Sequence, residues 1–307
     1  MVVAQVLDVS GWGTVQLEAR GSGSNQWRLD PDGALWLYKA TRVASHTGEL
    51  QGEDWAEKLV ESLARALGLP RAQIELATRA EAGEVEPGVV SRDLKLPDTD
   101  FQNGANLLAD VPDYRYRDSL NRPPKNHVGH SVVNVVEQLG RHGVGPPPQL
   151  AGSELSAVDV FAGYLVLDAW VGNLDGHEEN WAVLRALDGT MTLAPTYDHG
   201  AALGSSLTEE RRSRLAEDRA GLESFAERGF GRKFEDGAKV PLTTLAAQAL
   251  DLAAPRARDR WLGRLETVGR DAVHGLIADV PRMSDPARTF CENLVEINRE
   301  RILRVCR

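Results

Sequence analysis

Carboxylates, amides and a histidine lie close together in the segment 173–180, NLDGHEEN, which directly follows an apolar stretch. Asp175 and Asn180 are five residues apart, and Asp198 follows a predicted hairpin. Because a two-stranded hairpin returns the chain to its starting point, we expect Asp198 to lie beside the Asp175–Asn180 loop. The three side chains would supply hard oxygen ligands, which suit Mg2+ when water and phosphate oxygens complete its octahedron. The pattern is compatible with phosphoryl transfer, which needs a carboxylate to orient the attacking hydroxyl and oxygen ligands for the metal. A solvated polar loop is the alternative interpretation.

The elements on either side of this segment are predicted to position it. Residues 157–172, AVDVFAGYLVLDAWVG, form the most apolar predicted helix, with Ser156 as its N-cap and Asp159 three residues further on. Inside this helix we expect Trp170 to be a core aromatic residue and Asp168 to be a polar group with its hydrogen bonds satisfied. After the loop, WAVLRA, the turn LDGT and MTLAPTYD predict a hairpin over residues 181–198.

The first 95 residues or so are predicted to be rich in strands, with a single helix. QWRLD and ALWLYKA flank the turn PDG as a hairpin, which places Lys39 on its second strand. EDWAEKLVESLARALGLP has apolar residues at helical spacing and ends at Gly68 and Pro70. IELAT and GVVSR predict two more strands. The remainder is mainly helical after a polar, proline-bearing stretch, so we expect two domains, residues 1–95 and 96–307.

Length, charge and cysteine content narrow the class of protein. A chain of 307 residues, 42% of them hydrophobic, can bury one large core or two modest ones. The formal charge of −10 argues against nucleic-acid binding as the main task and does not favour an acidic acceptor. Two cysteines suit a reducing cytoplasm, although a disulfide between Cys291 and Cys306 stays open. Since no apolar run approaches the roughly 18 residues of a membrane span, we expect a soluble, cytoplasmic protein without a membrane or direct nucleic-acid partner.

The segments NLDGHEEN and PTYDHG resemble the catalytic segment of HipA-like kinases, which carry D-x-H-x-x-N and then an Asp after a short hairpin. The resemblance implies an α+β, two-lobed protein-kinase-like fold, with a small strand-rich lobe, a larger helical lobe and ATP between them. It implies that Asp175 orients or deprotonates the acceptor hydroxyl, and that Asn180 and Asp198 hold Mg2+. His177 completes the catalytic motif, and we interpret it as a structural residue that holds the loop.

The N-terminal block extends this resemblance. Lys39 lies where the ATP lysine sits in that family, and the following helix looks like the family's glutamate-led helix. By that match Glu57 is the partner of Lys39, with Glu53 and Glu61 as the alternatives.

The same resemblance predicts where the nucleotide lies. PGVVSRD corresponds to the hinge between the lobes, so adenine would meet the backbone groups of Val90, Ser91 and Arg92. RGSGSNQW is the candidate phosphate loop, in which the phosphates would be cradled by Ser22, Gly23, Ser24 and Asn25. A flexible linker is the alternative interpretation of this segment.

Some features depart from the family or compete with it. The chain is shorter than full-length HipA toxins, and the triplet after the hairpin reads DHG, with His199 in place of Phe. The candidate phosphate loop lacks the spaced G-x-G-x-x-G of typical protein kinases. His127 and His130 could be metal ligands, but no third ligand lies near them in the sequence.

The resemblance implies a Mg2+-dependent kinase that transfers the γ-phosphate of ATP to a Ser/Thr hydroxyl of a protein or peptide, with an antitoxin-type protein as a possible partner. An acceptor hydroxyl on a small molecule or natural product is an alternative within the same chemistry. A nucleotide-binding pseudokinase with a regulatory role, and a partner-binding helical protein without nucleotide affinity, are alternatives from other classes. Retention of Lys39, Asp175, Asn180 and Asp198 argues against the pseudokinase.

Overall fold

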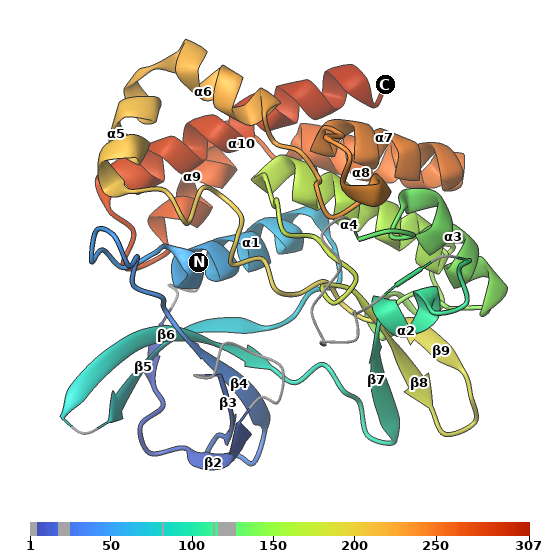
Figure 1. Cartoon of the computed structure of the whole chain (residues 1–307), viewed down its shortest axis with the longest axis horizontal. Helices are drawn as coiled ribbons and strands as arrows, with labels where there is room; N and C mark the ends of the chain where they lie inside the picture. Colours follow the sequence, from blue (N-terminus) through green and yellow to red (C-terminus); the bar gives the residue numbers. More distant parts are fainter. Residues whose placement is uncertain (1–4, 18–24, 82, 113, 116–126) are drawn as a thin grey trace.

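The chain folds into a strand-rich N-terminal part and a helical C-terminal part, as the computed structural model shows (Figure 1). The structure describes residues 5–17, 25–81, 83–112, 114–115 and 127–307. The predicted phosphate-loop residues Ser22, Gly23 and Ser24 lie outside these described residues.

The strands of the described residues form two sheets. In the six-stranded sheet the order is β1-β5-β6-β4-β3-β2, and in the three-stranded sheet it is β7-β8-β9. The strands are β1 (Val6–Asp8), β2 (Gly13–Leu17), β3 (Gln26–Leu29), β4 (Leu35–Ala40), β5 (Ile74–Glu81), β6 (Glu84–Arg92), β7 (Thr99–Asn103), β8 (Ala182–Ala186) and β9 (Met191–Leu193). All pairs are antiparallel except β1 with β5, which is parallel.

Alternation along β4 determines which way Lys39 points. Trp36 and Tyr38 face the side of the sheet that packs with Val9, Ala77 and Val90 in a small buried cluster. Side chains of neighbouring strand residues point to opposite faces, so Lys39 projects from the other face. That face is covered by the first helix of the chain, which therefore lies within reach of Lys39 (Figure 1).

Helices dominate the rest of the described chain. They are α1 (Glu53–Leu67), α2 (Gly104–Leu108), α3 (Val132–Arg141), α4 (Ala157–Val171), α5 (Glu209–Glu217), α6 (Arg219–Glu227), α7 (Leu242–Leu252), α8 (Pro255–Thr267), α9 (Arg270–Ala278) and α10 (Asp285–Val305), with short 3-10 turns at Pro148–Leu150 and Glu235–Gly237. The described residues contain no helix that has both the length and the apolar character of a membrane span.

Helix α1 joins the two parts of the molecule. It ends at Gly68, whose left-handed φ of 75° closes the helix without the cost that a Cβ would bring. Its apolar residues, including Leu59 and Leu63, are fully buried in one continuous core with α4 and α10. Figure 1 shows α1 lying between the six-stranded sheet and the layer of helices. Any residue on its sheet-facing side is therefore held rigidly relative to the C-terminal part.

Helix α4 confirms the sequence prediction for residues 157–172. Ser156 accepts a hydrogen bond from the Asp159 N–H, and the Asp159 carboxylate accepts one from the Ser156 N–H, which completes a capping box. Trp170 is fully buried and donates its indole N–H to the Val295 carbonyl at 3.1 Å. The helix ends at Gly172 with a left-handed φ of 64°, which directs the chain into the loop 173–180.

The predicted hairpin over 181–198 is present, with β8 and β9 as its strands. The structure adds β7 as a third strand, because residues 99–103 return from the first part of the chain to pair with β8. Cys291 and Cys306 are both buried as free thiols, so the disulfide that the sequence left open is not formed.

Candidate functional site

Lys39, Glu57 and Asp198 meet at the junction of the two parts of the molecule. The Lys39 ammonium lies 3.3 Å from Glu57 Oε1 and 2.5 Å from Asp198 Oδ1. Glu57 Oε2 accepts a hydrogen bond of 3.0 Å from the His199 N–H. The buried Glu57 carboxylate thus links Lys39 of β4 to the backbone N–H of His199, which follows the hairpin. The alternatives Glu53 and Glu61 pair instead with Arg42 and Arg71, at 2.6 and 2.8 Å.

The β8–β9 hairpin and its continuation deliver Asp198. The Ala194 N–H donates to the Ala182 carbonyl at 2.9 Å, so the pairing continues past β9 and carries the chain back toward the loop 173–180. Asp198 itself has a left-handed φ of 63°, which Asp tolerates better than most residues. Its side chain is 43% exposed although its carboxylate contacts Lys39, so it remains accessible to a ligand. A left-handed backbone at a residue other than glycine is often found at functional sites.

Desolvation and the Lys39 ammonium determine the direction of the pKa shifts of the carboxyl groups in this cluster. Burial raises the pKa of Glu57, and the Lys39 ammonium opposes that effect. Lys39 also lowers the pKa of Asp198, which overcomes the opposite effect of desolvation. Asp198 is therefore ionised at neutral pH, as a ligand of a divalent cation must be.

Asn180 is oriented by two backbone carbonyls. Its Nδ2 donates to the Asp175 carbonyl at 3.0 Å and is 3.5 Å from the Asp198 carbonyl. Because only the NH2 group can donate, Oδ1 must point the other way. In the part of the chain that the structure describes, this buried Oδ1 has no hydrogen-bond partner. A buried acceptor without a partner is costly, and a cation would satisfy it.

These oxygens fit magnesium better than a transition metal. Within the described residues there is no cluster of three or more His, Cys, Asp or Glu side chains suited to a metal. Asp198 and Asn180 together offer one carboxylate and one amide oxygen. Mg2+ commonly takes one or two carboxylates and completes its shell with water and substrate phosphates. The donor set is therefore compatible with Mg2+ bound together with a phosphorylated substrate.

Asp175 lies on the rim of the same loop, with its side chain 49% exposed. Its N–H donates to Asn173 Oδ1 at 3.3 Å, which shapes the turn. The Lys233 ammonium lies 3.7 Å from Asp175 Oδ1, and His177 Nε2 lies 4.0 Å from Asp175 Oδ2. Sequence reasoning missed Lys233, because nothing in its neighbourhood distinguishes it from any other exposed lysine.

Glu178 anchors the loop from within. It is 2% exposed, and its Oε2 lies 2.7 Å from His127 Nδ1. Burial would raise the pKa of Glu178, yet the hydrogen bond from His127 and the proximity of His130 hold it at about 2. The ring of His127 is stacked on that of His177, with centroids 6.2 Å apart. His177 therefore packs against a residue from outside the loop, and its structural role stays a prediction.

His130 is a buried structural histidine. Its Nδ1 donates to the Lys233 carbonyl at 2.7 Å, and its Nε2 accepts from the Trp181 indole at 3.2 Å. Both nitrogens are used in the neutral tautomer, and burial lowers the pKa of His130 to about 4. Since His127 is bound to Glu178, neither histidine is free to ligate a metal in the way that the sequence left open.

A second buried group lies behind the DHG triplet. His199 Nε2 is 3.0 Å from Thr196 Oγ1 and 4.0 Å from Asp168 Oδ1. Asp168 accepts a hydrogen bond of 2.9 Å from Asn173 Nδ2, so the polar group inside α4 is satisfied as predicted. Burial raises the pKa of Asp168 and lowers that of His199. These contacts with Asp168 hold Asn173, at the start of the loop 173–180, and His199, after the hairpin.

The predicted adenine contacts have a different environment from the one expected for a hinge. Val90 and Ser91 lie within β6 and pair with β4 on one side and β5 on the other. The Arg92 N–H donates to the Gln73 carbonyl at 2.9 Å. The backbone groups of this segment are thus used by the sheet, and the connection between the two parts begins at Asp93. Asn25 is half-buried directly before β3.

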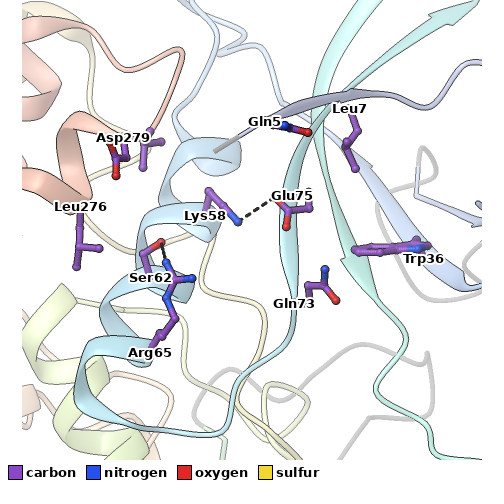
Figure 2. A pocket seen from close by; sticks show the side chains of 11 residues that line it. Gln5, Leu7, Trp36, Lys58, Ser62, Arg65, Gln73, Glu75, Leu276 and Asp279 are labelled. Carbon is purple, nitrogen blue, oxygen red and sulfur yellow. Dashed lines mark hydrogen bonds and ion pairs between the residues drawn. The ribbon is translucent and has the colours of Figure 1, made fainter. Parts of the chain in front are cut away.

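A cavity of about 330 Å3 lies elsewhere, between α1, the six-stranded sheet and the end of α9 (Figure 2). It is bordered by Lys58 and Arg65 of α1, by Glu75 of β5 and by the end of α9 at Asp279. Lys58 pairs with Glu75 at 2.9 Å, as Figure 2 shows. None of Lys39, Asp175 or Asp198 lines this cavity, so it is separate from the candidate site.

Comparison with known proteins gives similarity in structure only. No protein-family model matches the chain, and no curated protein matches it in sequence. The chain is similar to the Helicobacter pylori proinflammatory kinase CtkA, with a TM-score of 0.75 and 17% identity over 98% of this chain and 97% of that one. It is also similar to HipA of Shewanella oneidensis MR-1, solved with HipB and operator DNA, with a TM-score of 0.50 and 15% identity over 100% of this chain and 64% of that one. The Golgi casein kinase gives a TM-score of 0.50 and 12% identity over 98% and 72%.

These similarities show the fold. The predicted α+β architecture is confirmed: a small mixed sheet with one helix precedes a larger helical part, as in proteins with a protein-kinase-like fold.

Proposed function

We propose that the protein is a HipA-like, Mg2+-dependent kinase that transfers the γ-phosphate of ATP to a Ser/Thr hydroxyl of a protein or peptide. The observation that carries the proposal is the cluster in which Lys39 contacts both Glu57 and Asp198, beside an Asn180 Oδ1 that has no partner among the described residues. In a protein-kinase-like fold these are the groups that phosphoryl transfer uses. ATP would lie between the two predicted domains, which comprise residues 1–95 and residues 96–307.

Each group has a task that its environment suits. Lys39, held by Glu57, would bind the phosphates together with the predicted phosphate-loop residues, of which the structure describes Asn25. Asn180 and Asp198 would hold Mg2+, which would supply neutralisation of phosphate charge. Asp175 would accept the proton of the attacking hydroxyl as its oxygen forms the new bond to the γ-phosphorus. The bond from that phosphorus to the β–γ bridging oxygen breaks, and ADP leaves. His177 would hold the loop in place.

Two parts of the proposal depart from the sequence prediction. We infer that adenine meets the connection from Asp93 onward, because Val90 and Ser91 are paired in the sheet on both sides. We also add Lys233, whose ammonium is 3.7 Å from Asp175, as a group that would orient that carboxylate.

The acceptor hydroxyl and a partner protein complete the proposal. A small-molecule hydroxyl would use the same chemistry, and a pseudokinase would bind nucleotide without transfer. The structure of the similar HipA includes HipB, and by analogy an antitoxin-type partner is part of the proposal. The buried free thiols of Cys291 and Cys306 are compatible with a cytoplasmic location.

A calorimetric titration of Mg·ATP tests the proposal. Asp198→Asn is the informative variant, because Asn also tolerates a left-handed backbone and only the charge is lost. We expect magnesium-dependent binding in the wild type and at least a tenfold weaker Kd in the variant. Asp259→Asn, an exposed acid on α8, is the matched control and should bind like the wild type. Absence of binding in the wild type would reject the proposal.

A further inference from the structure

A second cavity, of about 220 Å3, opens beside the loop that carries Asp175. Its apolar lining includes Leu174, Phe225 and Leu242, from the loop, α6 and α7. Pockets for whole small molecules measure about 300 to 1,000 Å3, so this cavity has the size for a side chain or a comparable group.

The charged residues that line this cavity are all arginines. Arg211 comes from α5, Arg228 follows α6, and Arg301 lies on α10. No Asp or Glu is among the described residues that line it. Across the described chain none of the three arginines forms an ion pair with a carboxylate, although Glu227 acts on Arg301 at longer range. Among the described residues, the three arginines of this cavity therefore have no carboxylate within ion-pair distance.

The three arginines are held to different degrees. Arg301 is half-buried and donates to the Ala226 carbonyl at 2.7 Å and to Asn298 Oδ1 at 3.0 Å. The exposed Arg228 donates to Ser224 Oγ at 2.6 Å. Arg211 is exposed, with no side-chain hydrogen bond inside the described part of the chain. Arg301 is thus held by two hydrogen bonds, whereas Arg228 and Arg211 are exposed. The three guanidinium groups lie around the apolar part of the lining.

Segments that carry the proposed site also contribute residues to the lining of this cavity. Leu174, which lines it, is adjacent in sequence to Asp175. Another part of the lining comes from the segment directly after the triplet 198–200 and consists of Ala201, Gly204, Ser206 and Leu207. On the other flank, Lys233 contacts Asp175. A chain whose hydroxyl reaches Asp175 would therefore place a neighbouring side chain at this cavity.

We propose that this cavity is an acceptor subsite that selects a peptide segment with an acidic side chain close to the phosphorylated Ser or Thr. The proposal rests on the proposed kinase function and adds the class of substrate. A carboxylate there would receive charge-assisted, potentially bidentate hydrogen bonds from guanidinium groups, while its methylene groups contact the apolar part of the lining. The overall charge of −10 pointed away from an acidic acceptor, but the fold gathers arginines from three separate helical segments at this one place.

Peptide binding to the full-length protein tests this subsite without requiring turnover. Labelled Ser-containing peptides that differ only in Glu or Gln, scanned over the positions flanking the Ser, are titrated by fluorescence anisotropy with Mg2+ and a non-hydrolysable ATP analogue. We expect the best Glu peptide to bind about tenfold more tightly than its Gln counterpart, since hydrogen bonds to charged groups are worth about that factor. In Arg211→Glu/Arg228→Glu the preference should disappear. Arg301 is left in place because it also supports the backbone at Ala226.

Arg214→Glu is the matched control, because Arg214 is exposed on the same helix as Arg211 but does not line the cavity. This variant should keep the preference for Glu. Equal binding of the Glu and Gln peptides to the wild type would overturn the subsite, as would a preference that survives in the double variant.

Calorimetry of Mg·ATP on the same proteins separates this inference from the proposed function. Nucleotide binding without acidic preference leaves the kinase proposal standing and rejects the subsite. Acidic preference without nucleotide binding rejects the kinase proposal and leaves an acidic-peptide site. Free glutamate that competes as strongly as the Glu peptide would overturn the assignment to a peptide.

Discussion

At the scale of single residues, the site depends on which atoms are left available after structural hydrogen bonds are made. Asn180 uses its NH2 group on the carbonyls of Asp175 and Asp198, and this leaves Oδ1 for a ligand. Glu57 is nearly fully buried and divides its two oxygens between Lys39 and the His199 N–H. Both side chains therefore make structural contacts in addition to the roles that we propose for them.

The role of Asn180 as a backbone clamp predicts a stability effect. Asn180→Asp replaces the donor by a carboxylate that faces two carbonyl oxygens. We expect the free energy of unfolding to fall by about 1–3 kcal/mol at pH 7, the cost of leaving buried polar groups unpaired. Urea denaturation at pH 7 and at pH 4 measures it. The loss should be smaller at pH 4, where a protonated carboxyl can donate again. Unchanged stability at pH 7 would show that the clamp contributes nothing.

The lowered pKa of His130 predicts that the free energy of unfolding depends on pH. Its pKa is lowered from 6.5 to about 4, so the unfolded chain takes up a proton at a higher pH than the folded protein does. The stability that neutral His130 contributes is complete above pH 6.5 and is lost as pH falls toward 4, by about 3 kcal/mol in total.

Denaturation curves from pH 7.5 to pH 4 on the wild type and His130→Gln measure this effect. Buried His199 titrates in the same direction and is present in both proteins, so the difference between the curves reports on His130 together with its coupling to Glu178. Parallel curves for the two proteins would contradict the assignment.

At the scale of elements, the loop 173–180 is held by segments from distant parts of the chain. Glu178 binds His127, while Asp236 and Glu235 accept hydrogen bonds from the N–H groups of Gly129 and Val132, at 2.9 and 3.0 Å. Lys233 reaches Asp175 from the same segment as Asp236. The segment 228–241 is thus part of the site, although its sequence carries no motif.

Helix α4 sets the start of this loop, and its N-terminus offers a direct test. Ser156→Ala removes one half of the capping box and should lower the free energy of unfolding by about 1 kcal/mol. Ser213→Ala, in the interior of α5, is the control and should change stability little, because Ala is the better helix former. Chemical denaturation measures both variants. Equal effects would mean that the cap does not stabilise α4.

At the scale of the whole molecule, the two parts share one continuous core. Leu59 and Leu63 of α1 belong to the same buried cluster as Trp170 of α4 and Phe290 of α10. The sheet of the N-terminal part contributes Leu76 to it, and its own smaller cluster lies on the opposite face. Separate unfolding of the N-terminal part would expose α1 and leave a large apolar cavity.

A shared core predicts one cooperative unfolding transition. Single-tryptophan variants that retain only Trp36, in the N-terminal sheet, or only Trp170, in α4, report on the two parts. We expect their fluorescence transitions in urea to coincide with the loss of helical circular dichroism. Two separated midpoints would show that the parts unfold independently.

Local rules were sufficient for most of the elements. Apolar spacing and the capping pair Ser156–Asp159 predicted α4, alternation around PDG predicted the hairpin with Lys39, and the DGT turn predicted β8 and β9. Each of these features depends on side chains within a few residues of one another, which a sequence displays directly. The expectation that Asp198 returns beside Asn180 came from the same geometry.

What only the tertiary structure decided involves residues that are far apart in the chain. β7 joined the hairpin from 80 or so residues away, β6 took Val90 and Ser91 into the interior of the sheet, and Lys233 came to Asp175 from a separate segment. The three arginines that line the cavity at Leu174 are scattered along the sequence among acids, so the net charge hides them. Local spacing determines the elements and their ends, whereas packing determines which surfaces meet, and the chemistry of this site depends on both.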